Sequence, residues 1–451
     1  MHRHATIAIV AALCLLTAAA SAPAAKKNRQ VSEDVVKKIT EAAPAEAPAK
    51  PAKDRKLLVY SRCKGFRHGS IPYGAKALEV LGKKTGAYEV VVNDDDAIFT
   101  PEKLKAFDAV CINNATTRWK ADGPEMAALK GFVEAGGGLV GIHAATDGTA
   151  GRLFGGLFSG HPWHQNVAIK NDDPDHPVNA AFEGKGFEVK DEIYQFRKIY
   201  SREKLRVLLS LDMTKVTKRG GRRDNDYAVS WVRSLGKGRV FYCSLGHRNE
   251  IFWNPAILKH YLAGVQFALG DLEADTTPSG PVETPKAPAF TLTDQNGKKV
   301  SLSDFDGKIV VLEWINWNCP YVKRHHEAGT MKKLAAKYAG KGVVWLGVNS
   351  TKGATAAQNR KAAEQYGLGY PVLDDSDGKV GRSYGARTTP HMFIIDAAGA
   401  IAYDGAIDDD PKGKKDKPAN FVARALNELL AGKDVSKFQT RPYGCTVKYA
   451  K

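Results

Sequence analysis

The sequence predicts an α/β protein with two domains, and three observations support this. The chain has 451 residues, which is too long for one ordinary hydrophobic core, and 43% of them are hydrophobic, enough for both domains to be globular. Short apolar, strand-like runs alternate with helical stretches, which is typical of a parallel sheet covered by helices. Residues 271–286, rich in Pro, Thr and acidic side chains, are expected to be the linker.

The first 22 residues have the pattern of a secretory signal peptide. Basic and imidazole side chains at positions 2–4 precede an apolar run over 7–16, and small residues end the segment. The run is too short to cross a bilayer as a helix. We therefore expect residues 1–22 to be removed, and the mature protein to be periplasmic or secreted without a transmembrane segment.

Residues 23–55 differ in composition from the rest of the chain. They are dominated by Ala, Pro, Lys and Glu and lack a periodic apolar face. A disordered or partly helical leader is the expectation for such a segment.

The formal net charge of +17 would suggest a nucleic acid partner for a cytoplasmic protein. An exported chain meets anionic membrane, cell wall or polysaccharide instead. The basic residues are scattered, apart from runs at 215–223 and 412–417, and no aromatic residues alternate with them. We interpret them as a solvated basic surface and expect no nucleic acid partner.

The first domain is expected over residues 56–270. Its sheet should be formed by the apolar runs 56–60, 88–92, 108–112, 138–142, 205–211, 227–232 and 238–244. Helical spacing of apolar residues predicts helices over 124–136 and 255–270, the second of which closes the domain.

The second domain is expected over residues 287–451. Two short strands lead to an apolar strand that ends in the run WINWNCPYVKRHHE, 314–327. A helix to about Tyr338, a strand over 343–349, a further helix and strand, and the run TTPHMFIID follow. This order places Cys319 where a strand turns into a helix.

Cys319 is the first candidate catalytic residue, because the N-terminus of a helix favours a thiolate over a thiol. Removal of the signal peptide would leave five cysteines, so at least one thiol stays unpaired within the chain. Cys111 and Cys243 lie inside strand-like runs and are expected to be buried and inert. The role of Cys63, on a loop after a strand, stays open.

The second domain resembles the thioredoxin-like superfamily, on the side of the peroxiredoxins and the alkyl hydroperoxide reductase/thiol-specific antioxidant group. The segment 287–308 is similar to the entry segment of that group, and Thr389-Pro390 matches the position of the cis-proline that faces the active thiol. The resemblance implies thiol redox chemistry at Cys319, with Thr389 and Pro390 in the site. It also implies an external thiol or disulfide as electron donor or acceptor, and no cofactor.

Two departures from the family pattern restrict this chemistry. Val322 stands where the second cysteine of a C-x-x-C motif would be, so dithiol exchange within the turn is excluded. Asn316 stands three residues before Cys319, where the peroxidatic pattern has Thr. Cys445 is either the resolving or structural partner of Cys319, or a free or intermolecular thiol. The basic residues at 323–326 either favour the thiolate or form an exposed basic helix face.

Several histidines of the first domain lie at the ends of strands or in the loops that follow. They are His68, His143, His161, His164 and His247. Ligands bind at the carboxyl ends of the strands in an open parallel sheet. We therefore expect His68, His143 and His247 to converge on one pocket, with Glu192 and at least one of His161 and His164 on its wall.

The first domain also resembles the trehalose-utilisation ThuA-like family, whose fold is related to class I glutamine amidotransferases. The strings that carry the resemblance are GFRH, GGGLVGIHAATD, GHPWH, DHP, DEIYQF and GKGRVFYCSLGH. It implies a flavodoxin-like fold. His143 takes the place of the nucleophilic cysteine at the strand-to-helix elbow, so glutamine hydrolysis is not expected.

Three interpretations of the histidines remain open. They could form a sugar-related site, with His143 and His247 as acid/base groups and Glu192 or Asp147 as partners. They could bind a metal ion, although no local His spacing supports this and we assign no metal ligand. They could also be packing residues of a domain that binds without catalysing.

The sequence as a whole favours an exported protein with thiol redox chemistry at Cys319 and a carbohydrate-related site in the first domain. One alternative is a non-catalytic extracytoplasmic binding protein. The other is a metal-dependent sugar-processing enzyme in which the thioredoxin-like domain is accessory.

Overall fold

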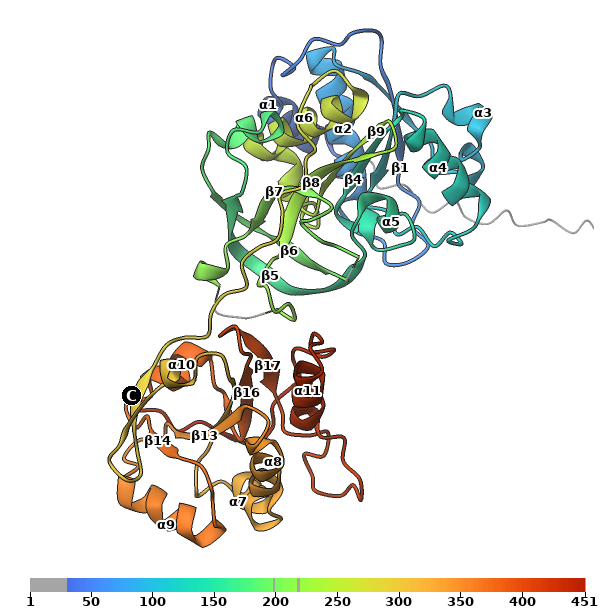
Figure 1. The fold of residues 1–451 in the computed structure, drawn as a ribbon. Coiled ribbons are helices and arrows are strands. Elements are labelled where there is room, and N and C mark those ends of the chain that lie inside the picture. Colours follow the sequence, from blue (N-terminus) through green and yellow to red (C-terminus); the bar gives the residue numbers. More distant parts are fainter. Residues whose placement is uncertain (1–30, 198, 217–219, 451) are drawn as a thin grey trace, which may run out of the picture.

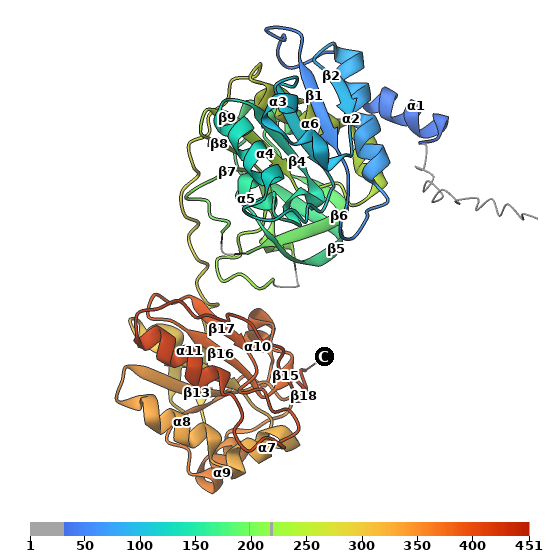
Figure 2. The same ribbon diagram turned by 90° about the vertical axis from the view of Figure 1, so that its right-hand side faces the viewer.

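The computed structural model describes residues 31–450, apart from 198 and 217–219. The expected signal peptide, 1–22, lies outside the described residues. The chain forms two lobes joined by residues 271–286 (Figures 1 and 2). No helix in the described part of the chain combines the length and apolarity that a membrane span needs.

The first lobe is built on a nine-stranded sheet in the order β2-β1-β3-β4-β9-β8-β7-β5-β6. The first five of these strands run parallel, and the remaining pairs are antiparallel. The strands are β1 Lys56–Tyr60, β2 Glu89–Val92, β3 Ala109–Asn113, β4 Gly138–Ile142, β5 Phe158–Asn171, β6 Phe187–Phe196, β7 Arg206–Leu211, β8 Ala228–Leu235 and β9 Gly238–Cys243.

Helices cover both faces of this sheet. They are α1 Glu33–Ala42, α2 Ile71–Thr85, α3 Pro101–Leu104, α4 Pro124–Glu134, α5 Gly151–Phe154 and α6 Pro255–Leu269, with short 3₁₀ turns at Asp96–Ile98, His143–Thr146, Pro177–Phe182, Met213–Lys215 and Asn249–Trp253. The alternation of β1 shows why there are two cores: Leu57 and Val59 pack with α2 and α6, whereas Leu58 and Tyr60 pack with α3 and α4.

The α/β class is confirmed, but the parallel sheet is continued by an antiparallel half. The seven predicted strands are present, with ends that differ from the prediction by no more than three residues, and so are the helices predicted over 124–136 and 255–270. β5 and β6 were not predicted from the sequence. Gly160 and Pro162 interrupt the pattern of β5, and its pairing with β6 shifts register on either side of Gly160. His161 and His164 therefore lie on a strand and not in a loop.

The leader is ordered over its described part, residues 31–55. Ile39 of α1 is fully buried in the first core. Beyond α1, the backbone of Ala49 forms two hydrogen bonds with the side-chain amide of Gln266. Arg55 pairs with Asp271 at 2.6 Å, where the linker begins. The disordered alternative is thus wrong for this segment, whereas the partly helical one holds for Glu33–Ala42.

The second lobe is built on a seven-stranded sheet in the order β11-β10-β14-β13-β12-β16-β17. Its strands are β10 Thr291–Asp294, β11 Lys299–Ser301, β12 Ile309–Trp314, β13 Val343–Asn349, β14 Val372–Asp374, β16 His391–Ile395 and β17 Ile401–Gly405. Its helices are α7 Pro320–Glu327, α8 Thr330–Ala339, α9 Ala356–Tyr366, α10 Lys379–Tyr384 and α11 Phe421–Leu430, with a 3₁₀ turn at Leu302–Phe305. A separate two-stranded pair joins β15 Thr388–Thr389 to β18 Cys445–Thr446.

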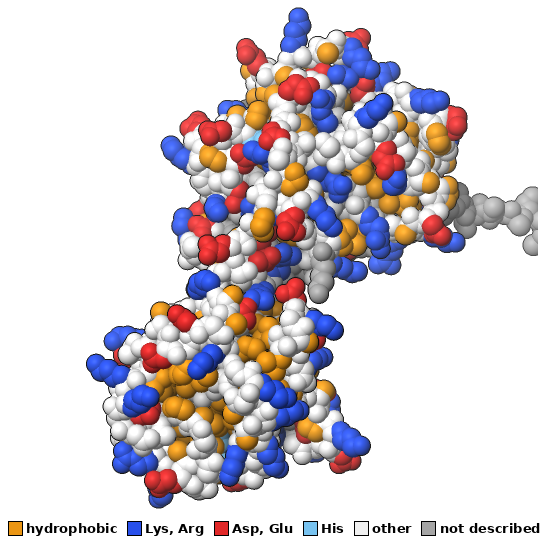
Figure 3. Space-filling view, viewed as in Figure 1, with side chains coloured by type: hydrophobic (Ala, Val, Ile, Leu, Met, Phe, Trp, Pro, Cys, Tyr) orange, Lys and Arg blue, Asp and Glu red, His pale blue; other side chains and the backbone are white. Residues whose placement is uncertain are grey.

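The basic residues do not gather into one large patch on the face drawn in Figure 3. Lys and Arg side chains alternate there with Asp and Glu over both lobes. This distribution agrees with the solvated basic surface expected from the sequence.

We predict that Ile39→Ala lowers the free energy of unfolding of the first domain by about 2–5 kcal/mol, because the change leaves a cavity in its core. Denaturant unfolding followed by tryptophan fluorescence measures this. Lys37→Ala, on the exposed face of the same helix, is the control, with a change of no more than about 0.5 kcal/mol. Equal curves for both variants would mean that α1 does not contribute to the core.

Candidate functional site

The thiol site lies where β12 turns into α7. Cys319 is the N-cap residue of α7 and is only 2% exposed. Its Sγ lies 2.9 Å from the carbonyl oxygen of Thr389, and the Thr389-Pro390 peptide bond is cis. The structure thus brings together Cys319, Thr389 and Pro390, as the sequence predicted.

Cys445 reaches the same place through the C-terminal segment of the chain. Thr389 and Cys445 are direct partners in the β15–β18 pair. Cys445 packs against the small apolar cluster that holds Cys319 and Val322, and the thiols of Cys319 and Cys445 are close enough to hydrogen bond. Both are free thiols in this structure. The second sulfur missing from the turn is therefore available from β18.

The two thiols have different acidities. Burial alone would raise the pKa of Cys319, but hydrogen bonds from the Thr389 side chain, the Cys445 thiol and the Val322 backbone outweigh it, so this pKa lies below its ordinary value. Burial and the neighbouring Cys319 raise the pKa of Cys445 to about 11. Cys319 is thus the group that ionises first, as a nucleophile requires.

A buried carboxylate lies beneath this turn. Glu313 of β12 is fully buried and accepts hydrogen bonds from Trp345 and Tyr370, both at 3.1 Å. His326 Nε2 lies 2.9 Å from its other oxygen. Glu313 was not predicted as a site residue, although a lone acidic residue in the apolar run IVVLEW was a usable signal.

The residues at 323–326 do not form an exposed basic face throughout. His325 and His326 are each only 5% exposed, and His325 Nε2 lies 2.9 Å from the hydroxyl of Tyr443 in the C-terminal segment. The interpretation as an exposed face is wrong for these two residues. They instead tie α7 to the sheet and to the segment that carries Cys445.

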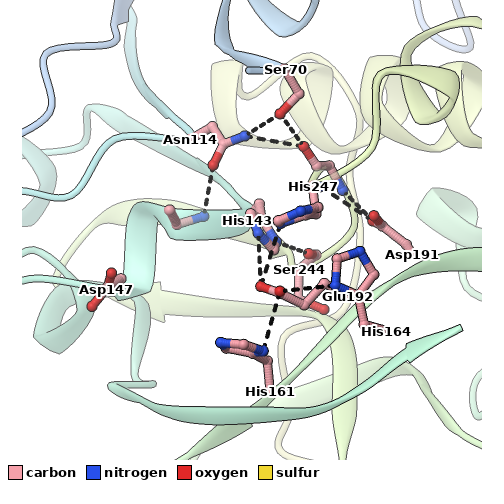
Figure 4. A network of polar contacts seen from close by, with 12 residues as sticks. Ser70, Asn114, His143, Asp147, His161, His164, Asp191, Glu192, Ser244 and His247 are labelled. Carbon is pink, nitrogen blue, oxygen red and sulfur yellow. Dashed lines mark hydrogen bonds and ion pairs between the residues drawn. The ribbon is translucent and has the colours of Figure 1, made fainter. Parts of the chain in front are cut away.

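The histidine site lies at the carboxyl ends of the parallel strands of the first sheet. His68 follows β1, His143 directly follows β4 and His247 follows β9, while Glu192 lies on β6. Figure 4 shows His143 and His247 beside the carboxylate of Glu192. Each of these four residues offers a ligand atom, and these atoms all lie within 4.8 Å of one another. The structure thus produces the convergence that the strand order predicted.

Glu192 is the centre of this cluster. Its Oε1 lies 3.6 Å from Nε2 of His143 and 3.4 Å from Nδ1 of His247. Its Oε2 lies 3.2 Å from Nδ1 of His161 and 3.5 Å from Nδ1 of His164. His161 and His164 are partly exposed to solvent, and both lie beside the carboxylate of Glu192 (Figure 4).

Asp147, the other predicted carboxylate, is not part of this cluster. Its Oδ2 accepts a 3.4 Å hydrogen bond from Thr116, and Figure 4 shows it pointing away from the imidazoles. Asp147 instead lines a neighbouring cavity of about 420 Å³, together with Arg118 and Arg197. Phe158 also lines this cavity, and its ring stacks on the ring of His161.

A buried hydrogen-bond network holds the loops of the histidine site. Asp191 accepts backbone N–H bonds from Gly246 at 2.6 Å and Arg248 at 2.9 Å, which fixes His247 between them. Asn114 and Ser70 both donate to the carbonyl of Gly246. Gly246 has φ +132°, a conformation that favours glycine.

The members of this network were not predicted from the sequence. Asp191 stands directly before Glu192 in the string DEIYQF, and Asn114 directly follows β3 at the same sheet edge. These positions in the sequence were therefore the signal that could have placed both residues near the histidine site. A further backbone contact fixes the ring of His143, whose Nδ1 lies 2.6 Å from the carbonyl oxygen of Ser244.

The surroundings of the histidines shift their pKa values in opposite directions. Burial lowers the pKa of His68 to about 4 and also lowers the pKa of the fully buried His143. The contact with Glu192 raises the pKa of His247 despite its partial burial. Neutral imidazoles at His68 and His143 are therefore favoured at neutral pH.

The folds and sites of the two lobes together indicate the class of protein. It is an α/β protein that combines a thioredoxin-like thiol site with a polar site at the edge of a parallel sheet. Residues 56–268 match the family described as ThuA, trehalose utilisation, and residues 284–404 match the AhpC/TSA family. The chain therefore carries a ThuA domain followed by an AhpC/TSA thioredoxin-like domain.

Individual proteins show the same two similarities. The chain is 35% identical over 133 residues to the thiol-disulfide oxidoreductase ResA of Bacillus thuringiensis, which covers 29% of this chain and 70% of that protein. It is 35% identical over 121 residues to the thioredoxin-like protein YneN of Bacillus subtilis, covering 26% and 68%. A ThuA-like protein of Bacteroides uniformis, known by its crystal structure, is 26% identical and covers 48% of this chain and 94% of its own, with a TM-score of 0.40.

We predict that alkylation of Cys319 by iodoacetamide rises with pH to a plateau, with a midpoint below that of an ordinary thiol, because the thiolate is the reactive form. Cys445→Ser should leave a reactive Cys319, and Thr389→Val should shift the midpoint to higher pH, since the hydroxyl no longer supports the thiolate. Peptide mass spectrometry resolves the rate for each cysteine. A midpoint in Thr389→Val equal to or below that of the parent would contradict this account.

Proposed function

We propose that this chain is an exported thiol-disulfide oxidoreductase that uses Cys319 as the nucleophile and Cys445 as the resolving thiol. The observation that carries the proposal is the β15–β18 pairing, which places Cys445 beside Cys319 where the turn itself offers only Val322. The similarity to ResA and YneN supports the reaction class. The signal-like pattern of residues 1–22 supports export, where disulfide substrates occur.

The reaction consists of two exchanges. The Cys319 thiolate attacks one sulfur of a substrate disulfide, forming a mixed disulfide, and the second substrate sulfur leaves as a thiolate that takes up a proton. Cys445 then loses its proton and attacks the sulfur of Cys319. This forms the Cys319–Cys445 disulfide and releases the first substrate sulfur as a thiolate.

The electrons balance over these two steps. The substrate disulfide gains two electrons, and the protein dithiol loses two. An external dithiol restores the reduced protein, and the reverse sequence would oxidise a substrate dithiol. The lowered pKa of Cys319 and the raised pKa of Cys445 agree with these roles, because the first thiol attacks and the second is held protonated until the mixed disulfide forms.

We predict that the aromatic disulfide 5,5′-dithiobis(2-nitrobenzoate) distinguishes these roles in a Cys63→Ser background, which removes a half-buried competing thiol. With both cysteines present, the pair should release two thionitrobenzoate ions and retain none. Cys445→Ser should release one and keep one as a stable adduct on Cys319. Cys319→Ser should lose the rapid phase. Absorbance and intact mass measure the two quantities.

A rescue variant provides the matched control. Adding Val322→Cys to Cys445→Ser restores a second thiol within the turn, so the adduct should again resolve. Release of both ions by Cys445→Ser without Val322→Cys would show that Cys445 is not the resolving thiol.

We further propose that the ThuA domain binds a hydroxyl-rich, carbohydrate-class ligand in the cavity beside the histidine site. The description of its family as trehalose utilisation supports this, as does the polar lining of the cavity by Thr116, Asp147 and Arg197. These side chains can donate and accept hydrogen bonds to hydroxyl groups.

We predict that trehalose or glucose binds the parent chain in calorimetric titration, and that Asp147→Asn weakens binding at least about tenfold, since it removes a charged acceptor. The comparison variant for Asp147→Asn is Arg152→Lys, which changes another residue of the same cavity and keeps its positive charge. No heat from either sugar, or equal affinity for parent and Asp147→Asn, would refute this ligand class.

A further inference from the structure

The histidine site of the ThuA domain has the composition of a metal centre. His68, His143, Glu192 and His247 lie far apart in the sequence, yet their four ligand atoms lie within 4.8 Å of one another. Three imidazoles and one carboxylate suit zinc, iron, cobalt or nickel better than magnesium or calcium, which prefer oxygen ligands.

Three of the imidazole nitrogens in this cluster are buried and form no hydrogen bond of good geometry within the described residues, although two of them, on His143 and His247, lie 3.6 and 3.4 Å from Oε1 of Glu192. They are Nδ1 of His68, Nε2 of His143 and Nδ1 of His247. Buried polar atoms are nearly always satisfied in folded proteins, so three such atoms in one cluster call for a common partner. A single cation between the rings would satisfy nitrogen lone pairs and the Glu192 charge together.

The tautomer of His143 is fixed for this role. Its Nδ1 lies 2.6 Å from the carbonyl oxygen of Ser244, so this nitrogen carries the proton and donates it. Nε2 is then left with a lone pair, 3.6 Å from Oε1 of Glu192. A backbone carbonyl that orients the outer nitrogen of a ligating histidine is a common arrangement around metal ions.

The loops that carry the ligands are fixed before any ion binds. Asp191 holds the backbone on both sides of His247, and Asn114 links the loop of Gly246 to the elbow after His143 through a 3.3 Å bond from Ala144 N–H. Within this framework the four ligand atoms already lie within 4.8 Å of one another.

We propose that His68, His143, His247 and Glu192 bind a divalent first-row transition metal ion, with zinc as the reference ion. His161 and His164 face the second oxygen of Glu192 from the solvent side, so a small ligand would approach the ion from there. This metal site is independent of the thiol chemistry of the second domain.

The test uses the full chain with Cys319→Ser and Cys445→Ser, because a dithiol could itself bind zinc. After treatment with a chelator and its removal, calorimetric titration with Zn²⁺ should show one site in the first domain, and Zn²⁺ should raise the midpoint of thermal unfolding. Co²⁺ should give visible absorption bands of a four- or five-coordinate site with nitrogen and oxygen ligands.

Separate variants at two ligands guard against loss of folding in one of them. His143→Gln and Glu192→Gln should each weaken Zn²⁺ binding by more than about 100-fold, since loss of an outer-shell partner alone costs 10–100-fold in metal sites. His176→Gln, a mostly buried histidine outside the cluster, is the matched control and should bind as the parent does. Circular dichroism confirms folding of each variant.

Two results would overturn the proposal. The first is a parent chain that binds neither Zn²⁺ nor Co²⁺ more tightly than about 100 μM, in which case the cluster is a polar ligand pocket without metal. The second is binding that Glu192→Gln and His143→Gln leave unchanged while His176→Gln or other histidines abolish it.

Discussion

The antiparallel pairing of β15 with β18 is the interaction on which the thiol site depends. Thioredoxin-like chemistry needs a second sulfur near the first, and the turn at Cys319 offers Val322 instead. Two backbone residue pairs, Thr388 with Thr446 and Thr389 with Cys445, place the missing sulfur beside the turn. The contact of His325 with Tyr443 holds the same C-terminal segment against α7. Cys319 and Cys445 are therefore neighbours in space although they lie far apart in the sequence.

The first domain also brings together residues that are distant in the sequence, but it does so through the edge of a parallel sheet. Its site residues come from loops after parallel strands, which all open at one edge of a sheet. Convergence alone does not fix the orientation of a side chain, and buried polar groups supply that here. The short segment around Gly246 is held by hydrogen bonds with Asp191, Asn114 and Ser70. This network has its hydrogen bonds formed, whereas the histidine cluster that it orients has unsatisfied nitrogens. The contrast between the two supports the proposed metal site.

The sequence was informative where hydrophobic periodicity was strong. The strand GLVGI was predictable from its continuous apolar pattern. The helix that begins at Pro255 was predictable because its regular apolar pattern, its Asn cap and its terminal Gly270 all indicate the same element. β5 was not predictable, because Gly160, Pro162 and exposed polar residues leave this strand, with its two register shifts, little hydrophobic signal. Likewise, the strand ends predicted that His68, His143 and His247 meet, whereas the place of Asp147 outside the cluster depends on the path of a 3₁₀ turn.

The anchoring of the leader at Gln266 and Asp271 has a consequence for dissecting this protein. The matched family begins at residue 56, yet the folded unit begins earlier. A shortened chain starting at Lys56 would uncover the surface that Ile39 fills, leave the Gln266 amide without its backbone partners and release Asp271 from Arg55. Because the linker begins at Asp271, trimming the N-terminal side would also remove an ion pair at the start of the linker. The first domain is therefore best isolated with its leader attached.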